Sequence, residues 1–196
     1  MPAEKYMSRQ WDIEAKLLYS VIVAGKNAKF ADIKVRLLLQ YVKQEEMPFQ
    51  MLRRLITENQ LENIIKEIKC GNYNKTTKAF TEIANANLDL ETCTPADLET
   101  IYGIGPKTSR FFIMWIRPVE KYAALDVHVL RWLNTIGIKA PKSTPSNKKL
   151  YEKLEKAFLL EAEKRNVTPR ELDLEIWEDG QRKNNIPEQE RLLPRA

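Results

Sequence analysis

The sequence contains two cysteines, one histidine and no long apolar run. Two cysteines, Cys70 and Cys93, provide neither a disulfide framework nor the four-ligand spacing of a zinc site. No apolar segment reaches the length needed to cross a bilayer, and the first residues lack the pattern of a signal peptide. We therefore expect a protein that keeps reduced thiols inside the cell and does not associate with membranes.

Strand signals are also scarce, whereas helix signals recur along the chain. Ser8 precedes an apolar stripe at helical spacing, Pro48 opens a further apolar segment, and both Thr94-Pro95 and Thr168-Pro169 combine an N-cap residue with a first-turn proline. The sequence predicts an all-α protein of about ten helices. It also predicts a helix from Ala28 to Gln44 and a capping box at residues 57–60.

The net charge of +5 and the isoelectric point near 9.1 are compatible with a polyanionic partner. Many basic proteins bind nothing acidic, so charge alone does not identify nucleic acid as the partner.

Residues 98–133 contain the most informative pattern, two expected helices joined by the tight turn Tyr102-Gly103-Ile104-Gly105-Pro106-Lys107-Thr108. The glycines permit a sharp turn and a close approach of another backbone. Pro106 suits the first turn of a helix whose free N–H groups point outward. Such a helix start binds anions, and a DNA phosphate would be held by Gly103, Gly105, Lys107 and Thr108.

This segment resembles the helix-hairpin-helix DNA glycosylase superfamily that includes endonuclease III. The turn alone also occurs in DNA-binding modules of polymerases and ligases, where the lysine is not catalytic. The added element is the D-x-H segment at Asp126 and His128, at the family's distance beyond Lys107. Residues 71–74 (GNYN), followed by Lys78-Ala79, are similar to a loop of the endonuclease III branch.

The resemblance implies two helical subdomains that flank an active-site cleft. The expected parts are an N-terminal helix at residues 1–25 that packs with the C-terminal subdomain, a helical subdomain at 26–125, a C-terminal subdomain at 126–180, and a polar tail at 181–196. The helix-hairpin-helix motif would occupy residues 94–117.

In this family, a lysine at the position of Lys107 attacks the sugar and forms a Schiff base, and Asp126 stabilises the positive charge that develops as the base leaves. The lysine makes such an enzyme both a glycosylase and an abasic-site lyase. Each residue also has a simpler interpretation. Lys107 could contact only a phosphate, Asp126 could serve only as an N-cap, and His128 is expected to have a packing role.

The resemblance further implies a monovalent cation, K⁺ or Na⁺, held by the backbone carbonyls of Glu99, Ile101 and Ile104. No other cofactor is expected. The cluster-binding branch of the family uses four cysteines after the aspartate, and none follows Asp126. An iron–sulfur cluster is therefore not expected.

Excision of a base from a duplex requires that the nucleotide be flipped out and its space filled. By position, the candidates for filling the duplex or reading the base are Lys26, Asn27, Asn72, Tyr73 and Trp177. The alternative remains that Asn72 and Asn74 are turn residues and that Tyr73 and Trp177 are packed in the core.

This sequence resembles the compact 8-oxoguanine glycosylases of archaea and bacteria in two respects. It lacks the cysteines of an iron–sulfur cluster, and its segment around Trp177 is similar to the end of those enzymes. In that group a terminal lysine follows the last helix closely, whereas this sequence continues to Ala196. We expect a monomer, associated with the nucleoid or the nucleus, that acts on double-stranded DNA with a damaged base, 8-oxoguanine first. The alternatives are an oxidised or mismatched pyrimidine as the substrate, or a DNA-binding module without catalysis.

Overall fold

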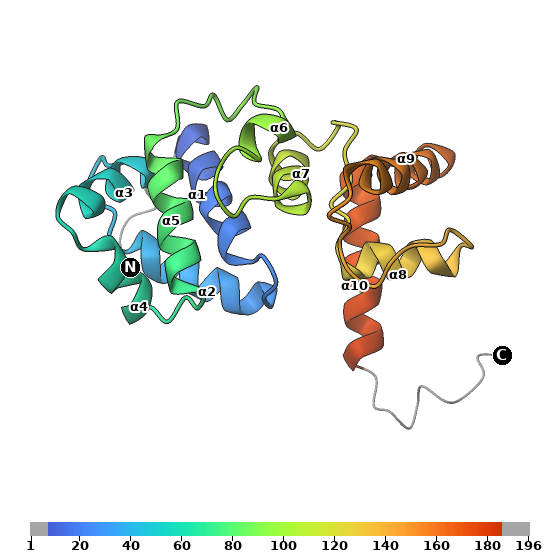
Figure 1. The fold of residues 1–196 in the computed structure, drawn as a ribbon, viewed down its shortest axis with the longest axis horizontal. Coiled ribbons are helices and arrows are strands. Elements are labelled where there is room, and N and C mark those ends of the chain that lie inside the picture. Colours follow the sequence, from blue (N-terminus) through green and yellow to red (C-terminus); the bar gives the residue numbers. More distant parts are fainter. Residues whose placement is uncertain (1–7, 186–196) are drawn as a thin grey trace. The chain divides into compact units, whose positions relative to one another are not determined.

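The computed structural model describes residues 8–185, which form ten helices and no strand (Figure 1). The helices are α1 (Arg9–Ile22), α2 (Ala28–Leu39), α3 (Pro48–Thr57), α4 (Leu61–Glu67), α5 (Tyr73–Asn85), α6 (Pro95–Leu98), α7 (Pro106–Ile116), α8 (Val127–Thr135), α9 (Lys148–Lys164) and α10 (Pro169–Asn185). The expected all-α class is confirmed. None of these helices is long and apolar enough to cross a membrane.

The chain forms two compact units, residues 1–112 and 113–196, and the boundary between them falls inside α7. It therefore comes earlier than the boundary expected at 125/126. Helix α1 packs on α2, α3 and α5 of the first unit. The expected packing of residues 1–25 with the C-terminal subdomain stays a prediction. The expected tail begins later than residue 181, because α10 continues to Asn185. Residues 186–196 lie outside the described part.

The first unit is built around α1 and α5, which bury apolar stripes at helical spacing. Leu18, Leu52 and Phe80 are fully buried there. Burial of one such side chain stabilises the fold by about 1.5–3 kcal/mol. The buried carboxylate of Glu14 on α1 accepts the N–H of Phe49 at 2.8 Å, so α1 satisfies a donor in the first turn of α3.

Two local predictions in the first unit are wrong. Thr57 does not open α4, because it is the last residue of α3 and its hydroxyl donates to the Arg53 carbonyl. Asn59 adopts a left-handed conformation (φ 54°) that ends α3. The second helix ends at Leu39 instead of Gln44, since the following residues form tighter i→i+3 turns.

The second unit has its own core, formed by the inward faces of α8, α9 and α10. Leu133, Phe158 and Leu172 are fully buried in it. The ring of Trp132 meets Phe158 edge-on, with centroids 6.0 Å apart, and the guanidinium carbon of Arg165 lies 5.2 Å from the centroid of the Trp132 ring. This core positions the start of α8, where the predicted aspartate lies.

Candidate functional site

The turn between α6 and α7, residues 99–105, is compact and partly buried. The Ile104 N–H donates to the Ile101 carbonyl at 3.1 Å, and both isoleucine side chains are buried. Gly103 has a φ of +83°, a conformation that side-chain-bearing residues rarely adopt. We refer to residues 99–105 as the α6–α7 turn.

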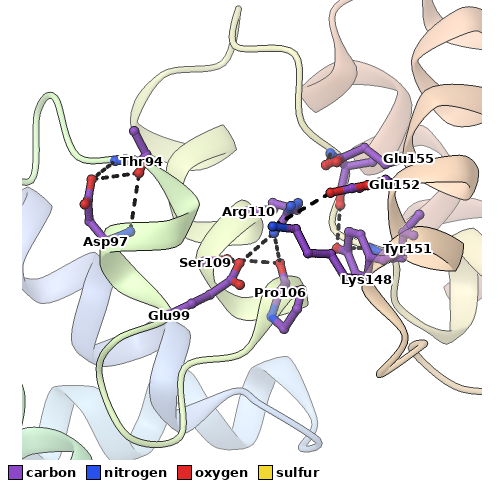
Figure 2. A network of polar contacts seen from close by, with 12 residues as sticks. Thr94, Asp97, Glu99, Pro106, Ser109, Arg110, Lys148, Tyr151, Glu152 and Glu155 are labelled. Atoms are coloured by element: carbon purple, nitrogen blue, oxygen red, sulfur yellow. Dashed lines mark hydrogen bonds and ion pairs between the residues drawn. The ribbon is translucent and has the colours of Figure 1, made fainter.

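Polar side chains fix the two helices on either side of this turn (Figure 2). Thr94 and Asp97 form a capping box at the start of α6, as expected. At the other end of α6, the Glu99 carboxylate accepts from the Arg110 guanidinium at 2.7 Å and from the buried Ser109 hydroxyl at 2.9 Å. Because Ser109 and Arg110 belong to α7, Glu99 holds the two helices in one orientation.

Helix α5 supports the α6–α7 turn from another side. The Glu82 carboxylate accepts the N–H of Tyr102, and the Lys78 ammonium lies 4.1 Å from the centroid of the Tyr102 ring. The side chain of Lys75 lies next to Gly103, where an added Cβ would come within 3.0 Å of the lysine Cε. Sequence reasoning missed Glu82, Lys75 and Lys78 as neighbours of the turn. The positively charged residues spaced along one face of residues 73–85 could have suggested the two lysines, whereas no local signal marks Glu82.

The backbone of the α6–α7 turn and of the first residues of α7 presents N–H groups that have no acceptor among the described residues. These are the N–H groups of Gly103, Gly105 and Lys107. The N–H of Thr108 is used within the turn, donating to the Gly105 carbonyl at 2.9 Å, and the Thr108 side chain is buried. The arrangement therefore offers three backbone donors and the positive end of α7 to an anion.

Lys107 is half-buried at the second position of α7. Its ammonium lies 5.3 Å from the centroid of the Phe111 ring, one helical turn further along. The Phe111 ring is in turn 6.5 Å from that of Tyr19 on α1. Within the described chain, no carboxylate forms an ion pair with Lys107.

Asp126 lies in the second unit and is the N-cap of α8, as predicted. One carboxylate oxygen, Oδ1, accepts the N–H groups of His128 at 2.8 Å and Val129 at 3.0 Å. In the described residues, Oδ2 has no hydrogen bond. The carboxylate thus combines a capping oxygen, which fixes its orientation, with a second oxygen available for other contacts.

Helix α9 holds the extended segment that leads into Asp126 (Figure 2). The Tyr151 hydroxyl donates to the Ala123 carbonyl at 2.7 Å and accepts the Leu125 N–H at 3.2 Å. The Glu155 carboxylate accepts the Ala123 N–H at 2.9 Å. Sequence reasoning missed Tyr151 and Glu155, because their partners are backbone atoms distant in the sequence.

Four of the candidates for base flipping lie on two loops that the structure brings together. The Lys26 ammonium donates to the Cys70 carbonyl at 2.7 Å and packs near Gly71. The Asn27 side chain caps α2 and accepts the N–H of Lys29 at 2.8 Å. Asn72 adopts a left-handed conformation (φ 49°) and its side chain caps nothing, and Tyr73 is 38% exposed.

Trp177 lies on α10 and is 37% exposed, so it is not a core residue. His128 lies on α8, and its imidazole approaches α10 at Gly180. The single histidine is thus engaged in packing between two helices.

The carbonyls expected to hold a monovalent cation differ in their hydrogen bonding. Ile101 accepts the N–H of Ile104, whereas the carbonyls of Glu99 and Ile104 accept no backbone N–H in the described part of the chain. Residues 8–185 contain no group of three or more His, Cys, Asp or Glu side chains suited to a metal ion. The carbonyl site stays a prediction.

A groove of about 450 Å³ lies in the second unit, between the ends of α9 and α10 that are joined by residues 165–168. Its lining is largely aliphatic, with Leu159, Leu160 and Val167, and none of the predicted site residues contributes to it. The candidate chemistry therefore rests on the α6–α7 turn and on the start of α8. No protein-family model and no solved structure matches the chain.

Proposed function

We propose that the protein is a DNA glycosylase with abasic-site lyase activity, of the helix-hairpin-helix type. The main supporting observation concerns residues 8–185. Among them, the N–H groups of Gly103, Gly105 and Lys107 have no acceptor, and the half-buried Lys107 has no carboxylate partner. Such a turn suits a DNA phosphate. In this proposal α6, the α6–α7 turn and α7 form the motif, and the two helical parts of the chain flank the cleft that receives the flipped nucleotide.

The proposed reaction uses Lys107 as the nucleophile. Its neutral amine attacks C1′ of the damaged nucleotide, the bond from C1′ to the base breaks, and the base leaves with a proton. The C1′–O4′ bond of the sugar ring then breaks, the ring oxygen takes up a proton, and the nitrogen and C1′ form a Schiff base. Removal of a proton from C2′ and cleavage of the C3′–O bond nick the strand by β-elimination.

Asp126 is proposed to stabilise the positive charge that develops on the sugar as the base leaves. Its Oδ1 is oriented by the start of α8, and its Oδ2 has no other hydrogen bond in the described residues. The proposal requires Lys107 and Asp126 to face the same nucleotide in the DNA complex. We propose 8-oxoguanine as the first lesion to test, and oxidised or mismatched pyrimidines as the next.

The deciding experiment incubates the protein with abasic and 8-oxoguanine duplexes in the presence of borohydride, which reduces a Schiff base to a stable bond. We expect a covalent protein–DNA complex. Lys107→Ala and Lys107→Arg should both abolish it and lower excision by on the order of a thousandfold or more. Lys107→Arg is the matched control, because it keeps a positive charge at the phosphate but lacks a nucleophilic amine.

Two outcomes contradict the proposal. Failure of the wild-type protein to form the complex or to nick any duplex in a lesion panel, despite binding DNA, would indicate a non-catalytic DNA-binding module. A complex that persists in both Lys107 variants would assign the nucleophile to another residue.

A further inference from the structure

Two lysines of α5 lie beside the α6–α7 turn and carry uncompensated charge. Lys75 and Lys78 are both exposed, and neither forms an ion pair in the described chain. Lys75 packs against Gly103, and Lys78 lies against the ring of Tyr102. Both side chains thus lie beside the turn that carries the N–H groups without an acceptor among the described residues.

The absence of an ion pair at Lys78 has a specific cause. Glu82 follows Lys78 by four residues on the same helix, a spacing at which opposite charges usually pair. Its carboxylate instead accepts the N–H of Tyr102. The fold therefore uses the natural partner of Lys78 to hold the turn, and the lysine charge remains available.

Tyr102 gives this lysine a defined position. The ammonium is 4.1 Å from the ring centroid, within the range of an attractive cation–π contact. The ring itself is 44% exposed and can be reached by a ligand. An exposed ring and an ammonium held on it form a contact surface suited to the sugar–phosphate backbone of a nucleic acid.

We propose that Lys75, Lys78 and Tyr102 form a second phosphate-contact site, which binds the DNA strand beside the phosphate held by the α6–α7 turn. The inference rests on the proposed function for the identity of the ligand. The site extends the DNA contact from α7 onto α5, and it makes α5 part of the DNA-binding surface as well as a support of the turn.

The test measures the affinity for an abasic duplex over a range of salt concentrations. Each lysine that neutralises a phosphate contributes about −0.9 to the slope of log K against log salt. Lys75→Ala and Lys78→Ala should each reduce the steepness of the slope by about that amount and weaken binding about five- to tenfold near 0.1 M salt. Lys78→Arg should restore most of the slope.

Lys66→Ala is the charge-matched control, since Lys66 lies on α4 of the same unit and pairs with Glu62 at 2.6 Å. It removes one positive charge and should leave the slope within error of the wild type. The contribution of the ring is tested with Tyr102→Phe, which keeps the cation–π contact, and Tyr102→Leu, which removes it. Tyr102→Leu should weaken binding in the wild-type background and have little effect after Lys78→Ala.

The outcomes separate this inference from the proposed function. Wild-type borohydride trapping combined with unchanged slopes in both lysine variants overturns the α5 site and leaves the enzyme proposal intact. Slopes that depend on Lys75 and Lys78 without any trapping support the α5 site and reject the enzyme. Failure of the wild-type protein to bind duplex DNA overturns both.

Discussion

The imidazole of His128 on α8 packs directly against Gly180 on α10, where a Cβ would come within 2.4 Å of the histidine Nδ1. A glycine inside a helix normally costs stability relative to alanine. Here it permits a close approach of α8 and α10 at a half-buried contact. The contact explains why His128, the only histidine of the chain, is engaged in packing and is sterically constrained.

We predict that Gly180→Ala destabilises the protein. An alanine in a helix interior usually gains about 0.5–1 kcal/mol over glycine, but the overlap with His128 forces a shift of the kind that costs about 1–3 kcal/mol in packed regions. The measurement is the free energy of unfolding in urea. In a double-mutant cycle, His128→Ala should relieve the effect and allow Gly180→Ala to stabilise. Equal effects of Gly180→Ala in both backgrounds would contradict the steric explanation.

A second prediction concerns the pH dependence of stability. The carboxylate of Glu46 is held by Arg54 through contacts of 2.8 and 2.9 Å, and the same guanidinium donates to the Tyr41 carbonyl at 2.7 Å. The hydrogen bonds from Arg54 hold the pKa of Glu46 below its ordinary value of 4.5. Since the folded state favours the charged form, this stabilisation is complete above about pH 4.5 and is lost as the pH falls through the lowered pKa.

Glu46→Gln should therefore lower the free energy of unfolding by about 1.5–3 kcal/mol at pH 7, and the difference from wild type should shrink below about pH 4.5. Urea unfolding at a series of pH values measures both. Glu58→Gln is the matched control, because Glu58 pairs with the same arginine at 3.4 Å but is more exposed. It should cost less than about 1 kcal/mol. A pH-independent difference for Glu46→Gln would exclude the ion pair as the cause.

Substitutions of Asp126 can separate its role as the N-cap of α8 from its proposed role in base excision. Asparagine is as good an N-cap as aspartate, so Asp126→Asn should leave the stability nearly unchanged, whereas Asp126→Ala should cost about 0.5–2 kcal/mol. Both variants should lower base excision about 10²–10³-fold, since each removes the carboxylate charge. Thermal unfolding and single-turnover excision are the two readouts. If Asp126→Asn excises the base at the wild-type rate, the role of this residue is limited to capping α8.

The two glycines of the turn should respond differently to alanine. Gly103 has a positive φ, so Gly103→Ala should cost about 1–2 kcal/mol. A Cβ on Gly105 meets no atom within 4 Å, and Gly105→Ala should leave stability largely unchanged. If a phosphate approaches this backbone, Gly105→Ala should nevertheless weaken binding to the abasic duplex. Unfolding and DNA titration of both variants measure this. Equal stability loss in the two variants would contradict the strain at Gly103.

Local signals predicted the helix starts that depend on neighbouring residues alone. Ser8, Thr94 and Asp126 each accept backbone N–H groups of the helix that follows, as their side chains and the flanking apolar pattern indicated. The prediction at Thr57 failed because a left-handed residue and a side-chain-to-backbone bond ended α3 first. A capping pattern in the sequence does not distinguish the end of one helix from the start of the next when the two are nearly continuous.

The sequence by itself determined the all-α class, the order of the helices and the turn that carries Lys107, because helical periodicity, caps and glycine geometry act over a few residues. Tertiary structure alone decided which side chains support that turn and the start of α8. Glu82 bonds a backbone N–H twenty residues away, and Tyr151 holds a segment twenty-six residues before it. Such contacts depend on how helices pack, and no local spacing encodes them.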